Sequence, residues 1–364
     1  MEAAKGHPDL QASFAAQPFL AADVGGTHAR VALVRTSRRG DCGLEVLAYR
    51  KFACRQFPSL WELLRAFLVH DARLPVRHCV LACAGQVMGD EILHDNLAWP
   101  IRLSQLRGAL ALDDVAALND FEAFAYALDD PLVRAGRLLC GPDFRGTDAR
   151  ENGPHETGPV LVIGPGTGLG AAVRLPGPTG SSVLTTEAGQ MDFAPHTIRE
   201  REVLACLAPQ GGYVAYERIT SGPGLLTLYT TLCGLHGIAP HLATPEAVTA
   251  AALAHADPHA EEAVEIFCAT LGSFAGSLAM AFMPSGGIYL GGGFLHSIFA
   301  LLERSAFVER FLHGRSVRSF LSRVPVRVME HGRHAVFGAA NWYLRRAGGA
   351  DESVPSRAST CRFT

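Results

Sequence analysis

The sequence has no excess of basic residues: its 364 residues include 32 Lys and Arg against 35 Asp and Glu, for a net charge of -3. A protein that binds the phosphate backbone of nucleic acid needs a positive surface, so this balance argues against a nucleic-acid partner. The first residues also lack the apolar core of about 7 to 15 residues that a signal peptide contains. We therefore expect a cytoplasmic protein.

Cysteine pairs typical of zinc sites are missing as well. The nine cysteines include no Cys-x-x-Cys spacing, and most of them lie inside apolar runs. This pattern predicts free, buried thiols in a reducing compartment. We expect Cys79 and Cys83, four residues apart in a strand-like run, to pack in a core.

Charged residues are absent from residues 266–302, which raises the question of a membrane span. Polar residues, glycines and Pro284 interrupt this run throughout. A buried helix followed by a buried strand explains the pattern better, and we expect no membrane partner.

The length exceeds the roughly 250 to 300 residues at which one hydrophobic core stops growing, so two lobes are expected. Strand-like and helix-like segments alternate, which is typical of α/β lobes. We expect a flexible leader at 1–18, a small lobe at 19–130 plus about 331–348, a large lobe at 131–330, and a disordered tail at 349–364.

Two segments follow one plan, in which an apolar strand enters a glycine and threonine turn and a second strand follows. The first strand is Phe19–Val24, which runs into Gly25-Gly26-Thr27. The second is Val160–Ile163, which runs into the segment from Gly164 to Gly168. This internal repeat predicts two lobes of similar construction.

Both turns are candidates for binding phosphate. Residues without a Cβ let backbone N–H groups approach an anion closely, and threonine hydroxyls can donate to phosphate oxygens. One glycine-rich turn can be purely conformational, but the matched pair favours phosphate. The candidate residues are Gly25, Gly26, Thr27, Gly164, Gly166, Thr167 and Gly168.

Two other nucleotide motifs fit less well. Gly166 to Ala171 resembles a dinucleotide fingerprint, with Glu187 as the acid for the ribose, but that motif must open a helix. Residues 171–180 contain two prolines and two glycines, which favour a strand that ends in a turn. A P-loop is excluded because no Gly-x4-Gly-Lys-Ser/Thr occurs.

A third glycine cluster flanks a short apolar strand near residue 290. The backbone at Gly291 and Gly292 could pack against an adenine ring. Close packing of the strand against a helix is the alternative, and the sequence leaves both open.

Several carboxylates are placed for chemistry. Asn119 and Asp120 follow an apolar strand, where α/β sheets bind ligands, although Asp120 could instead cap a helix. Phosphoryl transfer needs a carboxylate that accepts the proton of the attacking hydroxyl, which suits Asp120. Asp23, beside the first glycine turn, could hold Mg²⁺ directly or through water. Glu187 and Glu217 suit hydrogen bonds to the hydroxyls of a polyol.

The chain resembles the bacterial glucokinases of the hexokinase and actin-like ATPase superfamily from about Phe19 to Leu344. The motifs that carry this likeness are ADVGGTHARVAL, LNDFEAFAYAL, GPGTGLGAA, EAGQMDFAP, ERITSGPGLLTLY and GGIYLGGGF. The resemblance implies an α/β two-lobed actin-like ATPase (ribonuclease H-like) fold, with a cleft between a smaller N-terminal and a larger C-terminal lobe. It also implies ATP-dependent phosphorylation of glucose to glucose 6-phosphate, which feeds glycolysis.

The same resemblance assigns roles to residues. It makes Asp120 the catalytic base, Asn119 a sugar ligand, and Glu187 and Glu217 the sugar-binding acids. The ATP-phosphate turns fall on Asp23 to Thr27 and on Gly164 to Gly168. ATP with Mg²⁺ is the expected cofactor, and a cytoplasmic homodimer is the expected form.

One position departs from the family pattern: Gln190 stands where a histidine that contacts the sugar is common. Glutamine can donate and accept hydrogen bonds but lacks the shape and charge of imidazole, so Gln190 joins the candidate sugar-binding residues. The alternatives to a glucokinase are a kinase for another hexose or amino sugar, and a non-catalytic sugar-sensing protein of the same fold.

Overall fold

The computed structural model describes residues 17–36, 44–93, 97–142, 158–178, 180–292, 295–329 and 334–348. The chain divides into two compact units, Met1–Leu118 with Ala339–Thr364, and Asn119–Gly338. The first unit ends at Leu118 rather than near residue 130, because the helix that follows packs on the sheet of the second unit. The predicted leader, apart from residues 17 and 18, and the predicted tail lie outside the described residues.

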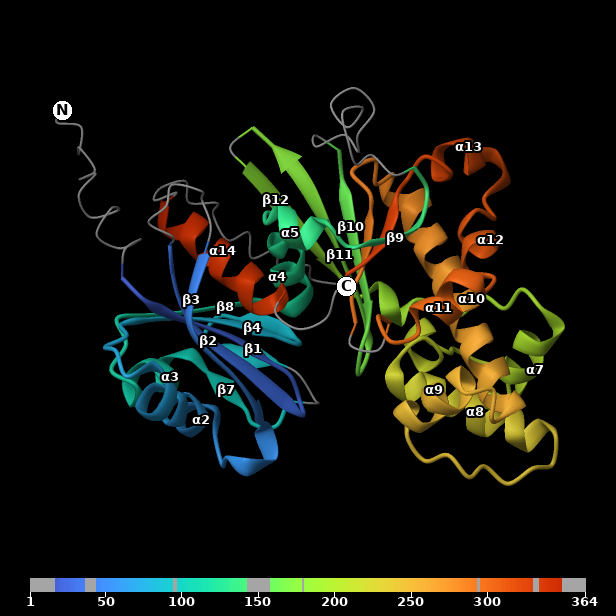
Figure 1. Cartoon of the computed structure of the whole chain (residues 1–364), viewed down its shortest axis with the longest axis horizontal. Helices are drawn as coiled ribbons and strands as arrows, with labels where there is room; N and C mark the ends of the chain where they lie inside the picture. The colour runs from blue at the N-terminus through green and yellow to red at the C-terminus, as the bar shows by residue number, and fades with distance from the viewer. Residues whose placement is uncertain are drawn as a thin grey trace, which may run out of the picture. The chain divides into compact units, whose positions relative to one another are not determined.

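The first unit is built on a five-stranded sheet with the order β3-β2-β1-β4-β8 (Figure 1). Its strands are β1 (Phe19–Val24), β2 (His28–Thr36), β3 (Leu44–Ala53), β4 (His78–Cys83) and β8 (Asp114–Asn119). Antiparallel pairs join β1 to β2 and β2 to β3, whereas β1 and β4 are parallel. A small second sheet contains β5 (Gln86–Met88), β6 (Glu91–Leu93) and β7 (Ile101–Arg102).

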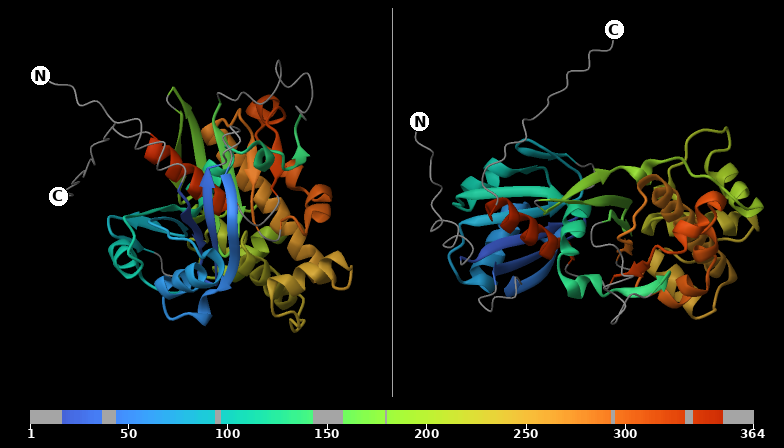
Figure 2. Two further views of the ribbon diagram at one scale, coloured as in Figure 1. Left: turned by 60° about the vertical axis from the view of Figure 1, so that its left-hand side comes forward. Right: turned by 90° about the horizontal axis from the view of Figure 1, so that it is seen from above.

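Helices cover both faces of the five-stranded sheet. They are η1 (Cys54–Gln56), α2 (Leu60–Phe67), η2 (Leu68–Ala72), α3 (Leu103–Ala109) and the last part of α14 (His334–Gly348). Alternate β1 residues, Leu20 and Ala22 among them, share a core with α2 and α3. On the other face the ring of Phe19 lies 5.3 Å from that of Tyr343 in α14, and Figures 1 and 2 show α14 lying across the sheet.

The second unit repeats this construction around a six-stranded sheet with the order β12-β11-β10-β13-β14-β9. Its strands are β9 (Arg137–Cys140), β10 (Val160–Pro165), β11 (Leu169–Gly177), β12 (Gly180–Thr186), β13 (Ile288–Leu290) and β14 (Val326–Val328). β10 pairs with β11 antiparallel and with β13 parallel, as β1 does with β2 and β4. The internal repeat predicted from the sequence is therefore confirmed.

The helices of the second unit lie on both faces of its sheet. They are α4 (Asp120–Ala127), α5 (Pro131–Arg134), η3 (Ala188–Gln190), α7 (Ile198–Leu207), η4 (Tyr216–Arg218), α8 (Gly222–Leu235), α9 (Pro245–Leu253), α10 (Pro258–Phe282), α11 (Phe299–Arg304), α12 (Phe307–Phe311), η5 (Arg315–Val317) and α13 (Arg318–Leu321). α8 and α10 share the main core with Leu161 and Ile163 of β10. α4 covers the other face, where Phe124 packs with Val162 and Tyr289.

The uncharged run predicted to be a buried helix and strand forms α10 and β13. Among the described residues α10 is the one helix long and apolar enough to cross a membrane, yet 83% of its most apolar window is buried within the protein. Asp257 caps its beginning by accepting hydrogen bonds from the N–H groups of His259 and Ala260. Burial on this scale is that of a core helix.

The prediction of free cysteines is confirmed for the described residues, and that of burial for five of them, since Cys140 is half-buried and Cys206 is exposed. All seven cysteines in the described part of the chain are free, and Cys79 and Cys83 are buried in the core of the first unit. Burial raises the pKa of Cys79 to about 12. Such a thiol stays protonated at neutral pH and is a poor nucleophile.

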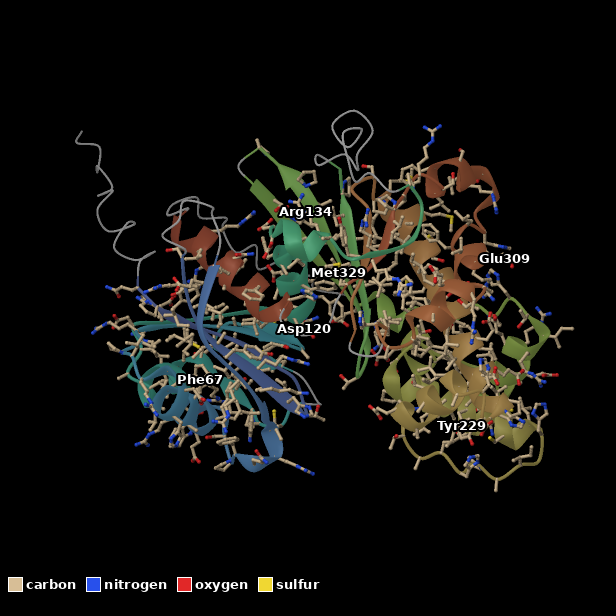
Figure 3. All side chains as sticks on the ribbon, viewed as in Figure 1. Phe67, Asp120, Arg134, Tyr229, Glu309 and Met329 are labelled. Atoms are coloured by element: carbon tan, nitrogen blue, oxygen red, sulfur yellow. The ribbon has the colours of Figure 1, made fainter. Side chains whose placement is uncertain are left out.

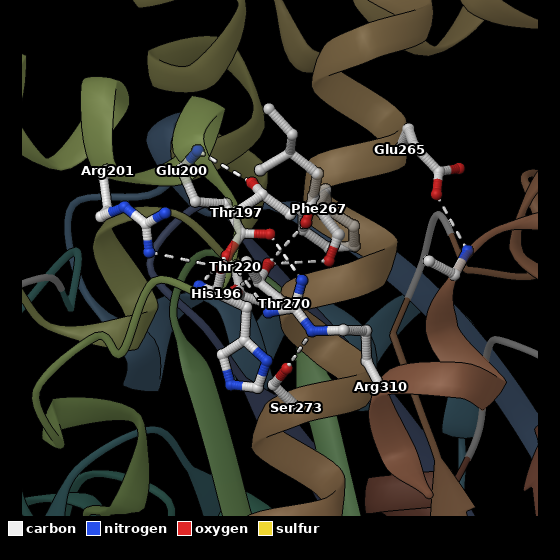
Figure 4. A network of polar contacts seen from close by, with 12 residues as sticks. His196, Thr197, Glu200, Arg201, Thr220, Glu265, Phe267, Thr270, Ser273 and Arg310 are labelled. Carbon is white, nitrogen blue, oxygen red and sulfur yellow. Dashed lines mark hydrogen bonds and ion pairs between the residues drawn. The ribbon is translucent and has the colours of Figure 1, made fainter. Parts of the chain in front are cut away.

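A buried ion pair ties three helices of the second unit together (Figure 4). Arg310 of α12 donates to both carboxylate oxygens of Glu200 in α7, at 2.6 and 3.1 Å, and to the hydroxyl of Ser273 in α10 at 2.8 Å. The side chains of Arg310 and Glu200 are 8% and 2% exposed. Burial opposes ionisation, but the hydrogen bonds and positive charge of Arg310, together with hydrogen bonds from the backbone of His196 and Thr197, hold the pKa of Glu200 below its usual value.

We expect Arg310→Met to lower the free energy of unfolding by about 3 to 5 kcal/mol, because it leaves the Glu200 carboxylate buried without a cation. Urea denaturation measures this. The control is Arg199→Met, because Arg199 pairs with Glu202 and Glu262 nearer the surface and should contribute less than about 1 kcal/mol. Equal losses of unfolding free energy in the two variants would contradict the stabilising role of the buried Glu200–Arg310 pair.

The ion pair of Glu200 with Arg310 also predicts how the free energy of unfolding depends on pH. Because the folded pKa of Glu200 is depressed, its contribution is present above the ordinary pKa of 4.5 and is lost as the pH falls through the folded value. The stability difference between the parent protein and Arg310→Met should therefore shrink on acidification.

Candidate functional site

The glycine turn of the second unit joins β10 to β11. Within it the N–H of Gly166 donates to the carbonyl of Gly168 at 2.7 Å, so this amide closes the turn. The chain then continues as the strand β11, not as a helix. The dinucleotide fingerprint is thereby excluded, as the prolines and glycines after the turn predicted.

The start of α4 is packed onto the two strands that flank this turn. Gly164 and Gly170 are cross-strand partners, and the ring of Phe121 occupies the space that a Cβ on either glycine would need. This packing explains the glycine at position 164, whose predicted role in phosphate binding stays a prediction. It also places Asp120, one residue before Phe121, beside the turn; Figure 3 shows Asp120 at the beginning of α4.

The capping role left open for Asp120 belongs mainly to its neighbour. Asn119 is the N-cap of α4, and its Oδ1 accepts hydrogen bonds from the N–H groups of Phe121 and Glu122 at 2.9 and 3.3 Å. Asp120 is the first residue of the helix, and its Oδ1 lies 3.0 Å from the N–H of Phe121. The first turn of a helix is a favourable place for negative charge because of the helix dipole, and Asp120 lies there.

Glu187 and Gln190 lie at the two ends of a short helical turn, η3, directly after β12. The hydroxyl of Thr186 donates to the carbonyl of Ala171 at 2.9 Å and anchors this segment to β11. Gly189 lies so close to the carbonyl of Leu169 that no side chain would fit there. η3 therefore rests on the first residue after the glycine turn, with Glu187 and Gln190 exposed.

An isolated antiparallel bridge between Asp192 and Ala215 joins η3 to the segment that carries Glu217, the second candidate sugar-binding acid. Around it the N–H of Phe193 donates to Val214 at 2.7 Å, and the N–H of Tyr216 donates to Met191 at 2.9 Å. These bonds bring η3, which ends at Gln190, against η4, which contains Glu217. Both residues line one cavity of about 350 Å³, together with Thr167, Leu207, Tyr213, Val214, Ala215, Arg218, Ser221, Pro223, Gly224 and Thr227.

Glu217 also contacts the glycine turn itself. Its Oε2 accepts a hydrogen bond from the N–H of Leu169 at 2.9 Å, and the N–H of Gly222 donates to the carbonyl of Gly166 at 2.8 Å. The segment that carries the predicted sugar acid is therefore joined to the predicted phosphate turn. Nothing in the spacing of the sequence indicated this contact.

The glycine turn of the first unit has a similar internal structure. The N–H of Gly25 donates to the carbonyl of His28 at 3.0 Å, and the N–H of Cys54 donates to Thr27 at 2.9 Å. As in the second unit, the amide of the leading glycine is used inside the turn. Donors to a phosphate would have to come from the following residues, Gly26 and Thr27 here and Thr167 and Gly168 there.

Asp23, the predicted magnesium residue, is paired with Arg30 across the β1–β2 hairpin at 2.8 Å. Burial raises the pKa of Asp23, although the guanidinium of Arg30 opposes the shift. Because Arg30 already supplies a positive charge at one carboxylate oxygen, Asp23 fits contact with Mg²⁺ through water better than direct ligation. In the parts of the chain that the structure describes, no group of three or more His, Cys, Asp and Glu side chains could hold a metal.

The glycines near residue 290 are accounted for by packing. The ring of Phe124 in α4 fills the space beside Gly291, and Gly292 has a φ of +139° with the carbonyl of Pro165 against it. A side chain is excluded at both positions. The close-packing alternative thus applies here, and contact with adenine stays a prediction.

Most of the predicted residues belong to the second unit: Asn119, Asp120, Gly164, Gly166, Thr167, Gly168, Glu187, Gln190, Glu217, Gly291 and Gly292. Asp23, Gly25, Gly26 and Thr27 belong to the first unit. Sequence patterns did not indicate Tyr213, whose hydroxyl donates to the backbone carbonyl of Gln190. The two glycines before it were the one local signal, and they indicate only a turn.

We expect Gly168→Ala to raise the KM for the sugar with little loss of stability. A Cβ there would lie 2.5 Å from Oε2 of Glu217, the movable end of a side chain, so the carboxylate should be displaced while the backbone stays. The displaced carboxylate loses its hydrogen bond to Leu169, and steady-state kinetics with thermal melting check both effects. The control is Gly166→Ala, whose Cβ meets open space and should leave the sugar KM unchanged.

Comparisons with known proteins agree with this geometry. The sequence profile described as Glucokinase matches residues 20–346. A glucokinase-like protein of Xylella fastidiosa strain 9a5c is 40% identical over 331 residues, which cover 90% of this chain and 95% of that protein. A glucokinase of Stenotrophomonas maltophilia strain R551-3 is 35% identical over 351 residues, covering 95% of this chain and 100% of that protein.

A solved structure shows the same fold. The crystal structure of a glucokinase from an Antarctic psychrotroph superposes with a TM-score of 0.75 at 29% identity, covering 89% of this chain and 98% of that one. The actin-like ATPase fold expected from the sequence is thereby confirmed. Because the profile and both relatives span most of its length, this chain belongs to the glucokinase family.

Proposed function

We propose that this protein is a glucokinase, which transfers the γ-phosphoryl group of ATP to the 6-hydroxyl of D-glucose and so supplies glycolysis with glucose 6-phosphate. The observation that carries the proposal is the shared anchoring of the candidate residues. Phe121 fixes Asp120 against the strands of the glycine turn, and Glu217 accepts a hydrogen bond from the residue that follows the same turn. These contacts support a site in which a base, a sugar-binding acid and a phosphate turn are anchored together.

In the proposed reaction, Asn119, Glu187, Gln190 and Glu217 form hydrogen bonds with the sugar hydroxyls. The carboxylate of Asp120 accepts the proton of the 6-hydroxyl as its oxygen bonds to the γ-phosphorus, and the bond to the leaving oxygen of ADP breaks. Thr167 and Gly168 donate to the phosphates, and Gly26 and Thr27 are the proposed phosphate donors of the first unit. Mg²⁺ bound with ATP would neutralise charge on the phosphates, and Asp23 would face it through water.

The location and assembly belong to the same proposal. The free cysteines of the described residues fit a reducing compartment, which supports a cytoplasmic enzyme. The proposed homodimer is based on the resemblance to the glucokinase family. Small molecules, glucose and ATP, are the proposed partners.

A second candidate function is favoured by one observation, the glutamine at position 190. An amide presents donors and an acceptor in a different arrangement from imidazole, so the preferred hexose or amino sugar could differ from glucose. The two functions share the chemistry and differ in the sugar.

Initial rates of ADP formation with MgATP and glucose, mannose, fructose or N-acetylglucosamine separate these functions. We expect kcat/KM for glucose to exceed the others by about 10-fold or more, because unpaired polar groups in the site penalise the wrong sugar. If another sugar is preferred, the second candidate is correct. Glucose binding by calorimetry without ADP formation would instead identify a non-catalytic sugar-binding protein.

We expect Asp120→Asn to lower kcat by about 10² to 10⁴-fold, because the amide cannot accept the proton of the attacking hydroxyl. The dissociation constant for glucose should change by less than about threefold, since the amide keeps the shape of the side chain. Glu122→Gln is the matched control on the same helix and should leave kcat nearly unchanged. A kcat equal to that of the parent protein would rule out Asp120 as the base.

A further inference from the structure

We infer that Tyr213 is a positioning residue for the sugar, which acts by holding the side chain of Gln190 in one orientation. The inference rests on the proposed function and names a residue that the family motifs do not contain. Its basis is the contact between two residues from different segments. Tyr213 precedes η4, and Gln190 ends η3.

The hydroxyl of Tyr213 contacts Gln190 at two points. It donates to the backbone carbonyl of Gln190, and the side-chain oxygen Oε1 of the same residue lies 3.3 Å from it. A phenol has one hydrogen, so the two oxygens share it. With Oε1 turned toward the phenol, the NH₂ group lies on the other side of the amide and presents donors to another partner.

The backbone holds Tyr213 in place for this contact. Gly211 and Gly212, with φ of +76° and +122°, form a turn that other residues adopt only with strain. On the other side, the carbonyl of Val214 accepts the hydrogen bond from Phe193 at 2.7 Å. The turn and the bridge together set the position of the ring opposite the end of η3.

The arrangement matters because glutamine is a flexible ligand. Its side chain has three rotatable torsions, and the amide can present either an oxygen or an NH₂ group to the sugar. Anchoring Oε1 before the sugar binds restricts the side-chain torsions and fixes which end of the amide faces the sugar. Binding then costs less conformational entropy. Gln190 and Tyr213 line the same cavity as Glu217. The site therefore presents a fixed donor beside a fixed carboxylate.

This geometry predicts what the position recognises. A donor at Gln190 needs a sugar hydroxyl oxygen as acceptor, and Glu217 needs a hydroxyl hydrogen as donor. The class of ligand is a hexose with a hydroxyl at the contacted carbon. A sugar that lacks this hydroxyl gains nothing from the orientation of Gln190.

The test is Tyr213→Phe, which removes the hydroxyl and keeps a ring that is 59% exposed, so the fold should be unaffected. We expect the KM for glucose to rise by about 5- to 20-fold, because the variant loses the hydrogen bond that orients Gln190. The kcat and the KM for ATP should stay within about twofold of the parent values. In the Gln190→Ala background the same change should raise the glucose KM by less than about twofold. One member of a series of monodeoxyglucoses should be insensitive to Tyr213→Phe.

Thr227→Val is the matched control. Thr227 borders the cavity, but its hydroxyl donates to the carbonyl of Pro223 at 3.0 Å. This variant should leave the glucose KM unchanged. A general effect of removing a hydroxyl from the cavity would appear in both variants.

Three outcomes overturn the inference: an unchanged glucose KM in Tyr213→Phe, an equal rise in the Gln190→Ala background, or a fall in kcat without a rise in KM. If any one of these outcomes is found while the parent protein phosphorylates glucose, the inference fails but the proposed function stands. If the parent protein forms no ADP with any sugar, the proposed function fails. The same variants are then compared by calorimetric binding of glucose, where an unchanged dissociation constant overturns the inference.

Discussion

The contact of the Phe121 ring with the backbone at Gly164 and Gly170 is the constraint on which the candidate site depends. A helix can approach a strand pair this closely only where the strands carry no side chains. Because the ring fills that space, the first turn of α4 has one position relative to β10 and β11. The residue before the ring, Asp120, therefore has a fixed position relative to the glycine turn, as a proton acceptor in phosphoryl transfer requires.

A second set of contacts joins the predicted sugar-binding residues to the same turn. Gly189 rests on Leu169, and the N–H of Leu169 donates to Glu217. A carboxylate that accepts one hydrogen bond from the protein still has lone pairs for a sugar hydroxyl. Leu169 thus lies at the meeting point of two segments that are far apart in the sequence. Any shift of the turn would move the predicted sugar-binding residues with it.

Two sets of polar side chains in the second unit differ in their burial. Glu200 and Arg310 are deeply buried and hydrogen-bonded to each other, and with Ser273 they join α7, α10 and α12. Glu187, Gln190 and Glu217 keep exposure to solvent or to the cavity. The first set stabilises a helical layer, and the second can exchange water for ligand hydroxyls.

The sequence by itself determined the strand and turn repeat, the buried helix at α10, the free cysteines and the strand that excludes a dinucleotide fingerprint. These features follow from local patterns, since apolar runs, prolines and glycines act on neighbouring residues. It also placed Asp120 at the end of a strand, but could not separate a base from a helix cap, because an aspartate at that place suits either role.

Only the tertiary structure decided which glycines form turns and which make room for a ring. In the sequence Gly164, Gly166 and Gly168 look alike, but Gly164 accommodates Phe121, Gly166 closes the turn and Gly168 faces Glu217. The contacts of Tyr213 with Gln190 and of Glu217 with Leu169 were equally hidden. Such contacts arise between segments that pairing and packing bring together, and no local pattern of residues encodes them.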